Sequence, residues 1–346
     1  MSDFFIVCVC AILGLAAHGA TRKRWLEWVL RIIIAIFFVG EGLYAAGANL
    51  IEDIASPWNR GILYSVTAFS GLDLVKLFRV GVSAVLTVVE YLIGGQWLIS
   101  LIRRQPLKPM AEKVFVVESI PHMVALFIYV QTMGYLLGAI NPQEMGMPNI
   151  PMPLPLPLLD LLGQLFSYNG LGMVILSFCG VGVYVSRKPR ECMTRLGWVK
   201  PTGPQIGIGL LIILGSFFYD YLWSLYAGNL HQDLGNKLAL YNSGTFAIVG
   251  GFHASVILAL ATAIFAGVGE ETLTRGALQP ALGIVPAGLI HGALHGQFAH
   301  APIFILQVAG WSCLMGIVRK YTNTTTTIIG HAGYNFVTTF LFSFNP

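Results

Sequence analysis

Two adjacent carboxylates, Glu270 and Glu271, lie near the end of a long apolar stretch, and Arg275 follows four residues after the second. A charge near the middle of a bilayer costs about 2.5–3.5 kcal/mol even on lenient scales, so such residues usually mark a functional site. Glu271 and Arg275 share one helix face at i,i+4 and are predicted to form an ion pair. Glu270 points about 100° away round the helix, where Arg275 neutralises it less well. Glu270 is therefore the candidate general base or acid.

Two further polar pairs with the same spacing follow in the next apolar segments. These are His291 with His295, and His331 with Asn335. A single histidine in a membrane helix is more often a hydrogen-bonding residue than a catalyst. Three segments that each present such a pair indicate a shared site, because the glycines beside both histidine pairs would let the helices approach closely.

These side chains suit hydrolysis of a peptide bond. A carboxylate and a histidine can activate a water molecule, and an imidazole with an amide can donate to the oxyanion that forms. A zinc site is the alternative, since two histidines and a glutamate are a common zinc set. The sequence contains no HExxH motif, however, and the helix with His291 and His295 lacks the glutamate that such a motif uses as a base. Hydrolysis without a metal is the favoured interpretation.

The composition indicates a polytopic membrane protein. Of 346 residues, 55% are hydrophobic and only 10% are charged, against about 25% charged in an ordinary soluble domain. The net charge of +4 comes from short basic clusters between apolar segments, which is typical of membrane topology and argues against nucleic-acid binding. The five cysteines lack a redox or zinc-like CxxC spacing and are interpreted as packing residues.

Apolar windows long enough to cross about 30 Å of hydrocarbon predict an all-α transmembrane bundle of about eight to ten spans. The first window has no basic residue before it and a basic cluster after it, which favours a retained span over a signal peptide. Alternating the spans from an external N-terminus places the basic clusters on one side, the cytoplasm by the positive-inside rule. The windows are 4–20, 27–47, 80–102, 114–140, 168–186, 204–226, 245–269, 284–299, 302–318 and 325–343.

The connections between windows suggest two regions. Residues 142–157 contain six prolines and are predicted to form an extended external loop. The basic stretch 187–200 is the best candidate boundary, with a helical region of unknown role at 1–199 and the functional region at 200–346. The polar pairs are expected in the cytoplasmic half of the membrane.

The motifs of the C-terminal region resemble those of the CAAX protease and bacteriocin-processing family, also called CPBP or ABI. The resemblance rests on Glu270-Glu271-x-x-x-Arg275-Gly276, His295 on the next helix, and His331-x-x-x-Asn335, and it covers about residues 245–343. The family contains glutamate-dependent intramembrane endopeptidases, including the type 2 CAAX prenyl endopeptidases. The stretch Leu196-Gly197-Trp198 also resembles family members.

The resemblance implies a role for each matching residue and no cofactor or catalytic metal. Glu270 and His295 would activate water, and His331 and Asn335 would form the oxyanion site. Glu271 and Arg275 would shape the site and its substrate contacts.

This sequence departs from the family pattern at His291, because the second motif usually reads Phe-x-x-x-His. Either the pocket is more polar here, or His291 takes part in activating the water. The spacing of the motif favours His295 as the partner of the base.

Non-catalytic functions are the alternative. The polar cluster could belong to a proton- or ion-coupled transporter, or to a membrane scaffold or immunity protein that does not turn over substrate. The sequence shows no internal repeat, which a transporter would be expected to have. The expected partners are membrane lipids and a protein or peptide substrate, lipidated or membrane-tethered. The expected location is a prokaryotic plasma membrane.

Overall fold

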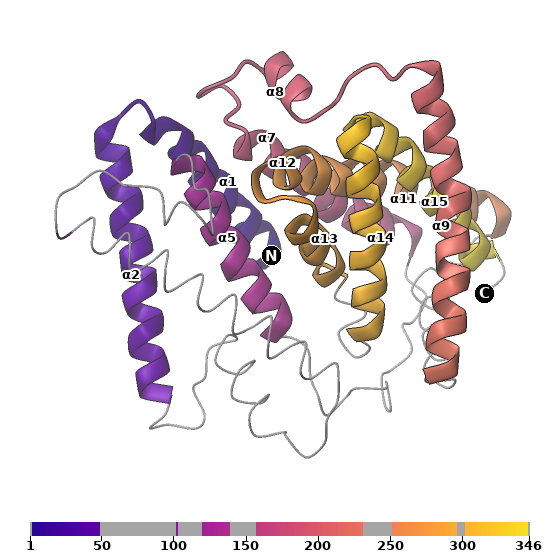
Figure 1. The fold of residues 1–346 in the computed structure, drawn as a ribbon, viewed down its shortest axis with the longest axis horizontal. Coiled ribbons are helices and arrows are strands. Elements are labelled where there is room, and N and C mark those ends of the chain that lie inside the picture. Colours follow the sequence, from indigo (N-terminus) through magenta and orange to yellow (C-terminus); the bar gives the residue numbers. More distant parts are fainter. Residues whose placement is uncertain are drawn as a thin grey trace.

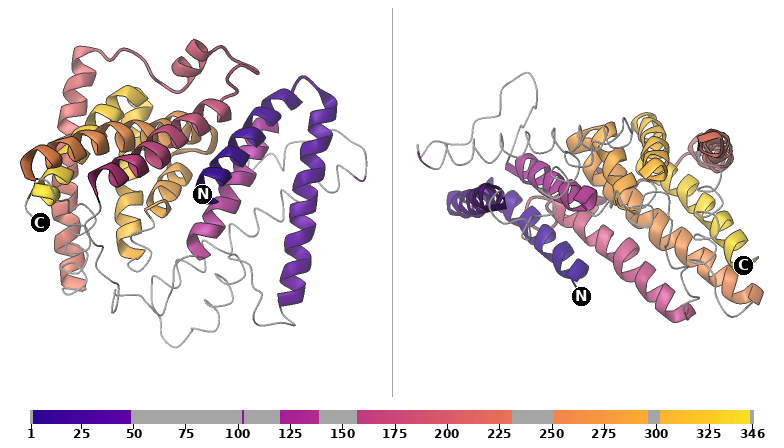
Figure 2. Two further views of the ribbon diagram at one scale, coloured as in Figure 1. Left: turned by 180° about the vertical axis from the view of Figure 1, so that it is seen from behind. Right: turned by 90° about the horizontal axis from the view of Figure 1, so that it is seen from below.

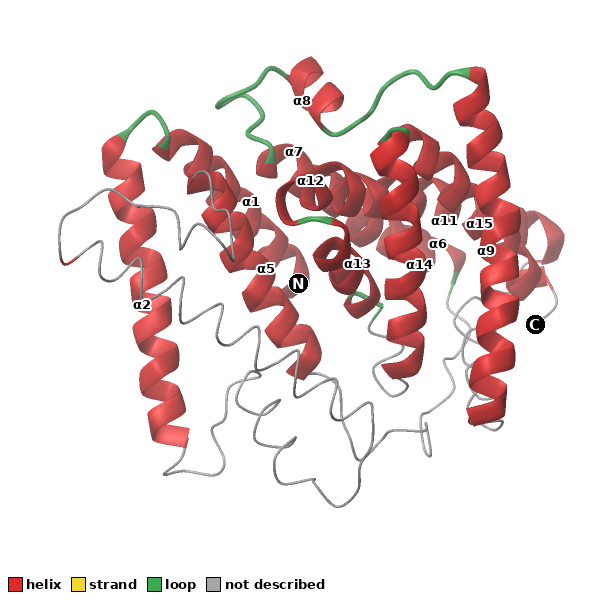
Figure 3. Cartoon of the chain, in the orientation of Figure 1, coloured by secondary structure: helices red, strands yellow, loops and turns green. Residues whose placement is uncertain are grey.

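The computed structural model describes residues 2–48, 102, 120–138, 157–230, 251–295 and 302–344. These residues form a bundle of helices, and Figure 3 shows no strand among them. The predicted all-α class is therefore confirmed. The elements of Figure 1 are α1 (Ser2–Ala20), α2 (Arg24–Ala48), α5 (Ile120–Gly138), α6 (Leu158–Gln164), η2 (Leu165–Gly172), α7 (Met173–Gly180), α8 (Pro189–Arg195), α9 (Gly203–Leu230), α11 (Gly251–Glu271), η3 (Thr272–Leu278), α12 (Gln279–Leu282), α13 (Ile284–Ala293), α14 (Pro302–Tyr321) and α15 (Thr324–Phe344).

Nine of the ten apolar windows overlap these helices, and the window 80–102 falls almost wholly outside the described residues. Within the described part of the chain, four helices are long and apolar enough to cross a membrane, and shorter apolar helices accompany them. The proline-rich segment 142–156 also lies outside the described residues. The long candidates are Leu158–Gly180, Gly203–Tyr226, Gly251–Leu282 and Ile303–Tyr321.

Three predicted boundaries are wrong. The window 168–186 is a helix over Leu158–Gly180, because Gly182 takes a positive φ of 82° that turns the chain out of the helix. The window 245–269 continues through a π-helical segment to Leu282. In the window 284–299, helix α13 ends at Ala293, Leu294 and His295 are not helical, and residues 296–299 lie outside the described residues.

Helix α11 lies at the centre of the C-terminal helices. It packs against α15 on one side and η2 on another, while α9 packs on α15 and α13 packs on α14. Helices α1, α2 and α5 cover the other side of the bundle, where α1 contacts α7 and α5 contacts α13 (Figure 2). One buried apolar cluster unites α1, α2, α5 and α13, with Leu30, Val130 and Ile290 among its members. The first helices therefore share a core with α13 of the C-terminal helices.

Two glycines let the neighbours of α11 approach it beside the carboxylates. A Cβ atom on Gly267 would lie 2.9 Å from the Cα of Ala332 on α15. A Cβ on Gly269 would overlap the backbone carbonyl of Asn169 on η2. Such contacts exclude any larger side chain without a backbone shift, so both α15 and η2 lie directly against the end of α11.

The basic connection after α7 is tied to the ends of these helices. Arg195 on α8 donates to the carbonyl of Gly276 at 3.3 Å, and the Trp198 indole donates to the Thr272 hydroxyl at 2.9 Å. Gly197, with a φ of 78°, accepts a hydrogen bond from the Thr325 amide at the start of α15. Residues 195–198 therefore hold α15 and η3 together at the basic end of the bundle.

Candidate active site

Glu270 and Glu271 are the last two residues of α11, and both are buried. The helix continues into η3 without leaving the bundle, so Arg275 remains inside the protein. The predicted ion pair is present: Arg275 Nη2 lies 3.3 Å from Glu271 Oε1, and the two side chains are 1% and 0% exposed. A buried charge requires such a partner, because desolvation of a lone ion costs several kcal/mol. Glu271 is therefore occupied by Arg275, and Glu270 is the carboxylate that lines a cavity.

Glu270 is held by polar side chains from two other elements. His291 Nε2 on α13 lies 3.0 Å from Glu270 Oε2, and Asn169 Nδ2 on η2 donates to Glu270 Oε1 at 2.8 Å. The other ring nitrogen of His291 lies 3.0 Å from the hydroxyl of Ser312 on α14. Because a carboxylate accepts only, His291 donates its Nε2–H and Ser312 donates to Nδ1. Both oxygens of Glu270 are thus oriented by a neighbouring donor.

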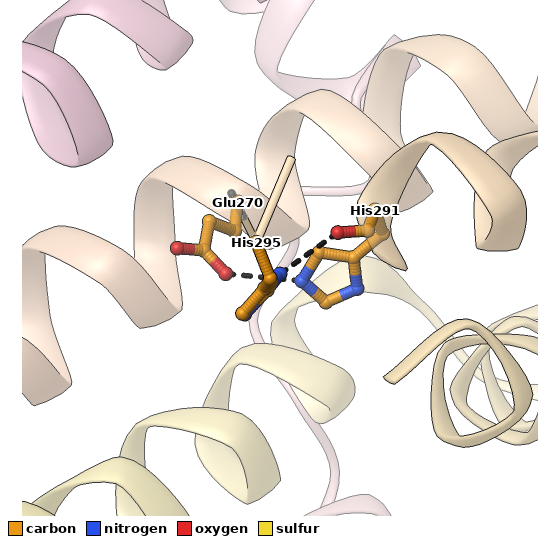
Figure 4. A group of neighbouring side chains, drawn as sticks. All are labelled: Glu270, His291 and His295. Carbon is orange, nitrogen blue, oxygen red and sulfur yellow. Dashed lines mark hydrogen bonds and ion pairs between the residues drawn. The ribbon is translucent and has the colours of Figure 1, made fainter. Parts of the chain in front are cut away.

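His295, which the motif spacing favours as the partner of Glu270, lies one turn beyond His291 and just past the end of α13. Its Nδ1 lies 2.8 Å from the carbonyl oxygen of His291, and the two imidazole centroids are 5.1 Å apart. His291, at the position where the family motif has Phe, donates a direct hydrogen bond to Glu270. Figure 4 shows both rings beside the Glu270 carboxylate, and one ligating atom of each of the three residues lies within 4.8 Å of the others.

The third motif faces the same site from α15. His331 Nδ1 lies 3.1 Å from Glu271 Oε1, and His331 Nε2 lies 3.9 Å from Glu270 Oε2. The indole of Trp311 packs edge-on against the His331 ring at a centroid distance of 4.9 Å. Asn335, one turn further along α15, lines the same cavity. The structure therefore brings all seven residues of the three motifs to one place.

A cavity of about 270 Å³ opens beside Glu270. A water molecule occupies about 30 Å³ in the liquid, so the cavity has room for a segment of substrate together with water. Charged and polar groups gather around Glu270, and alanine, threonine and larger apolar residues line the remainder. The lining residues are Leu165, Asn169, Met173, Thr262, Ala266, Glu270, Thr274, His291, Leu294, His295, His331, Tyr334, Asn335, Thr338, Thr339 and Phe342.

The motif spacing does not reveal Asn169. It precedes Glu270 by 101 positions and comes from the region before the expected boundary at 199. A lone amide in an apolar stretch is the only sequence signal at this position, and many such residues merely bond to a neighbouring helix. The π-helical geometry of η2 presents Asn169 to the site, and π-helical turns often occur at functional sites.

A second polar network braces the wall of the cavity. The Tyr334 hydroxyl on α15 donates to one oxygen of Asp220 on α9, and Gln307 Nε2 on α14 donates to the other at 2.9 Å. Three helices thus converge on one intramembrane carboxylate. Because Tyr334 also lines the cavity, this network holds the face of α15 that carries His331 and Asn335.

The sequence comparisons agree with the motifs. Residues 252–337 match the family model described as Type II CAAX prenyl endopeptidase Rce1-like, which confirms the resemblance and covers every motif residue. The match identifies the C-terminal helices as similar to a family of membrane proteases. Comparisons with curated proteins and with solved structures found no match.

Proposed function

We propose that this protein is an intramembrane endopeptidase that hydrolyses a peptide bond near the membrane surface without a catalytic metal. One observation carries the proposal: Glu270 is buried at the end of an apolar helix, oriented by His291 and Asn169, and opens into the cavity that His295, His331 and Asn335 also line. The ion pair of this helix is formed by Arg275 and Glu271. It does not account for the polar side chains that surround Glu270. The family match of this region points to the same activity.

In the proposed reaction, Glu270 accepts a proton from a water molecule in the cavity, and the water oxygen attacks the carbonyl carbon of the scissile peptide bond. His295 orients the water together with Glu270. The negative charge that develops on the carbonyl oxygen is stabilised by the amide of Asn335 and by His331. Glu270 then returns its proton to the nitrogen of the leaving amine as the C–N bond breaks.

Glu271 supports this chemistry through His331. A carboxylate that accepts from Nδ1 fixes the ring and stabilises its imidazolium form, in which Nε2 can donate to the oxyanion. Arg275 holds Glu271 in place through the ion pair. These two residues are positioning residues that also shape the substrate contacts.

The substrate is a lipidated or membrane-tethered protein or peptide in this proposal. The cavity lies among membrane helices, and its apolar walls suit a segment that arrives through the lipid phase. By the positive-inside rule the basic clusters favour an active site in the cytoplasmic half of the membrane, which in this proposal is a prokaryotic plasma membrane. Residues 200–346 form the catalytic region, to which residues 1–199 contribute Asn169 and a share of the apolar core.

The proposal is tested with the purified full chain reconstituted in liposomes. Candidate substrates are a prenylated CAAX peptide, a bacteriocin-type leader and a membrane protein with a C-terminal sorting tail, and mass spectrometry detects new termini. We expect cleavage of at least one substrate at a single bond. A preparation that cleaves none of them, but takes up protons or ions into the liposomes, would contradict the proposal and favour a transporter.

Substitution of Asn169 by alanine is expected to slow the same reaction. A hydrogen bond to a charged group contributes about 1.5–3 kcal/mol, so the loss of the 2.8 Å bond to Glu270 should lower kcat/KM roughly 10- to 150-fold. Gln164→Ala, at an exposed amide in the preceding helix, is the matched control and should keep wild-type activity. Equal rates for both variants would show that Asn169 does not orient the base.

A further inference from the structure

The three side chains nearest the proposed base also form a set of metal ligands. Glu270 supplies a carboxylate oxygen, and His291 and His295 each supply a ring nitrogen, all within 4.8 Å of one another. We propose that these residues bind a divalent transition-metal ion, for which Zn²⁺ is the best fit, and that the bound ion inhibits the enzyme. Two imidazoles and one carboxylate with an open fourth position are a common ligand set for Zn²⁺.

The distances require only a small rearrangement. Ligand atoms about 2.1 Å from a tetrahedral zinc lie roughly 3.4 Å from one another. His291 Nε2 and Glu270 Oε2 are already 3.0 Å apart. A small shift of the His295 side chain, just past the end of α13, can shorten the widest separation, and the adjoining cavity leaves space for a bound water or a substrate group.

Both histidines have the outer partner that metal-binding imidazoles usually have. Nδ1 of His291 faces the Ser312 hydroxyl at 3.0 Å, and Nδ1 of His295 faces the carbonyl of His291 at 2.8 Å. Such partners on one nitrogen fix the ring and direct the other nitrogen to the ion. A serine hydroxyl can donate or accept, so Ser312 can support His291 with the proton on Nε2 in the metal-free state and on Nδ1 in the metal-bound state.

The charge of the site also favours a cation. Glu270 and Glu271 are both buried, and the ion pair with Arg275 compensates one of them. With neutral His291 and His295, the three ligand side chains carry a net charge of −1. A divalent ion takes the place of the hydrogen between His291 and Glu270, and the carboxylate offsets part of its charge in this buried site.

A bound ion would block the reaction, a consequence that rests on the proposed function. In catalytic zinc sites of the HExxH type, the general base is a glutamate that does not bind the metal. Here the ion binds Glu270 itself, so Glu270 can no longer act as the base. The neighbouring Glu271 cannot substitute for it, because it is engaged by Arg275 and His331. The metal-bound form therefore has water in the cavity but no carboxylate to accept its proton.

Metal binding is measured on the full-length protein in detergent without any substrate. Co²⁺ serves as the spectroscopic probe, and Zn²⁺ binding is followed by competition with a chelator of known affinity. We expect one ion per chain, a tetrahedral Co²⁺ spectrum, and at least tenfold weaker binding in Glu270→Gln, His291→Phe and His295→Ala. Ser312→Ala should weaken binding about tenfold through loss of the outer partner. His253→Ala, at an exposed histidine in the first turn of α11, is the control that should bind normally.

Size-exclusion chromatography and thermal unfolding show whether each variant is folded. Because three ligand variants are compared, the test remains valid if one of them does not fold. Absence of a tetrahedral Co²⁺ spectrum in the wild type would overturn the metal site. The metal site would also be overturned if all three ligand variants were folded and bound the ion as tightly as the wild type.

The effect on catalysis is a separate measurement. Activity of the reconstituted wild type should fall as free Zn²⁺ rises, along the same curve as Zn²⁺ binding, and a chelator should restore it. Loss of activity on chelation would overturn the inhibitory role and identify the ion as catalytic. Normal Co²⁺ binding by a chain that cleaves no substrate would instead contradict the proposed function and leave the metal site intact.

Discussion

Glu270→Gln is expected to abolish peptide-bond hydrolysis, with kcat reduced about 10²- to 10⁴-fold, the usual contribution of general acid–base catalysis. Glutamine has nearly the same shape as glutamate and can still accept the hydrogen bond from Asn169, but it cannot take a proton from water. The loss is therefore chemical rather than structural. Rates are measured with the cleaved substrate in liposomes, and thermal unfolding verifies that the variant is folded.

Asp160→Asn is the matched control, because it removes an exposed carboxylate from another of the long apolar helices. Its rate should equal that of the wild type. If purified Glu270→Gln retained substantial activity, the base would have to be another residue and the proposed mechanism would fail.

Arg275→Met is expected to be among the most destabilising single substitutions in the chain. It leaves Glu271 buried at 0% exposure without its cation, and breaking a buried ion pair in this way typically costs about 3–5 kcal/mol. The midpoint of thermal unfolding in detergent should fall by roughly 5 °C or more. Arg190→Met, at an exposed arginine on α8, should leave the midpoint unchanged.

The double variant Glu271→Gln/Arg275→Met separates the cost of the unpaired charge from the cost of altered packing. Removal of both charges should recover most of the lost stability, because an uncharged pair of similar volume needs no compensation. An equally large loss in the double variant would show that Arg275 stabilises the protein through packing. Activity should remain low in either case, since Glu271 also holds His331.

The sequence alone indicates the relations between residues that lie close along one helix. The i,i+4 spacing predicts the Glu271–Arg275 pair, and the structure contains it. Apolar windows likewise predict most of the helices, because burial in lipid requires long stretches of apolar residues with internally bonded backbone. The observed helix boundaries differ from the predicted ones where the local backbone conformation ends or extends a helix. Gly182 follows the end of one helix, and a π-helical segment continues α11 beyond Glu271.

Relations between helices were decided by the tertiary structure. The spacing of the second motif does not predict that His291 bonds directly to Glu270. This contact depends on how far along α11 the helix α13 packs against it. Asn169 reaches the site only because glycine at 269 lets η2 lie against α11.

For this protein, the sequence by itself determined the membrane class, the ion pair and most of the polar residues that surround Glu270. The partners of Glu270 were settled only by helix packing. The physical reason is that helical periodicity determines which side chains share a face, whereas the separation and rotation of two helices depend on close contacts among residues far apart in the chain.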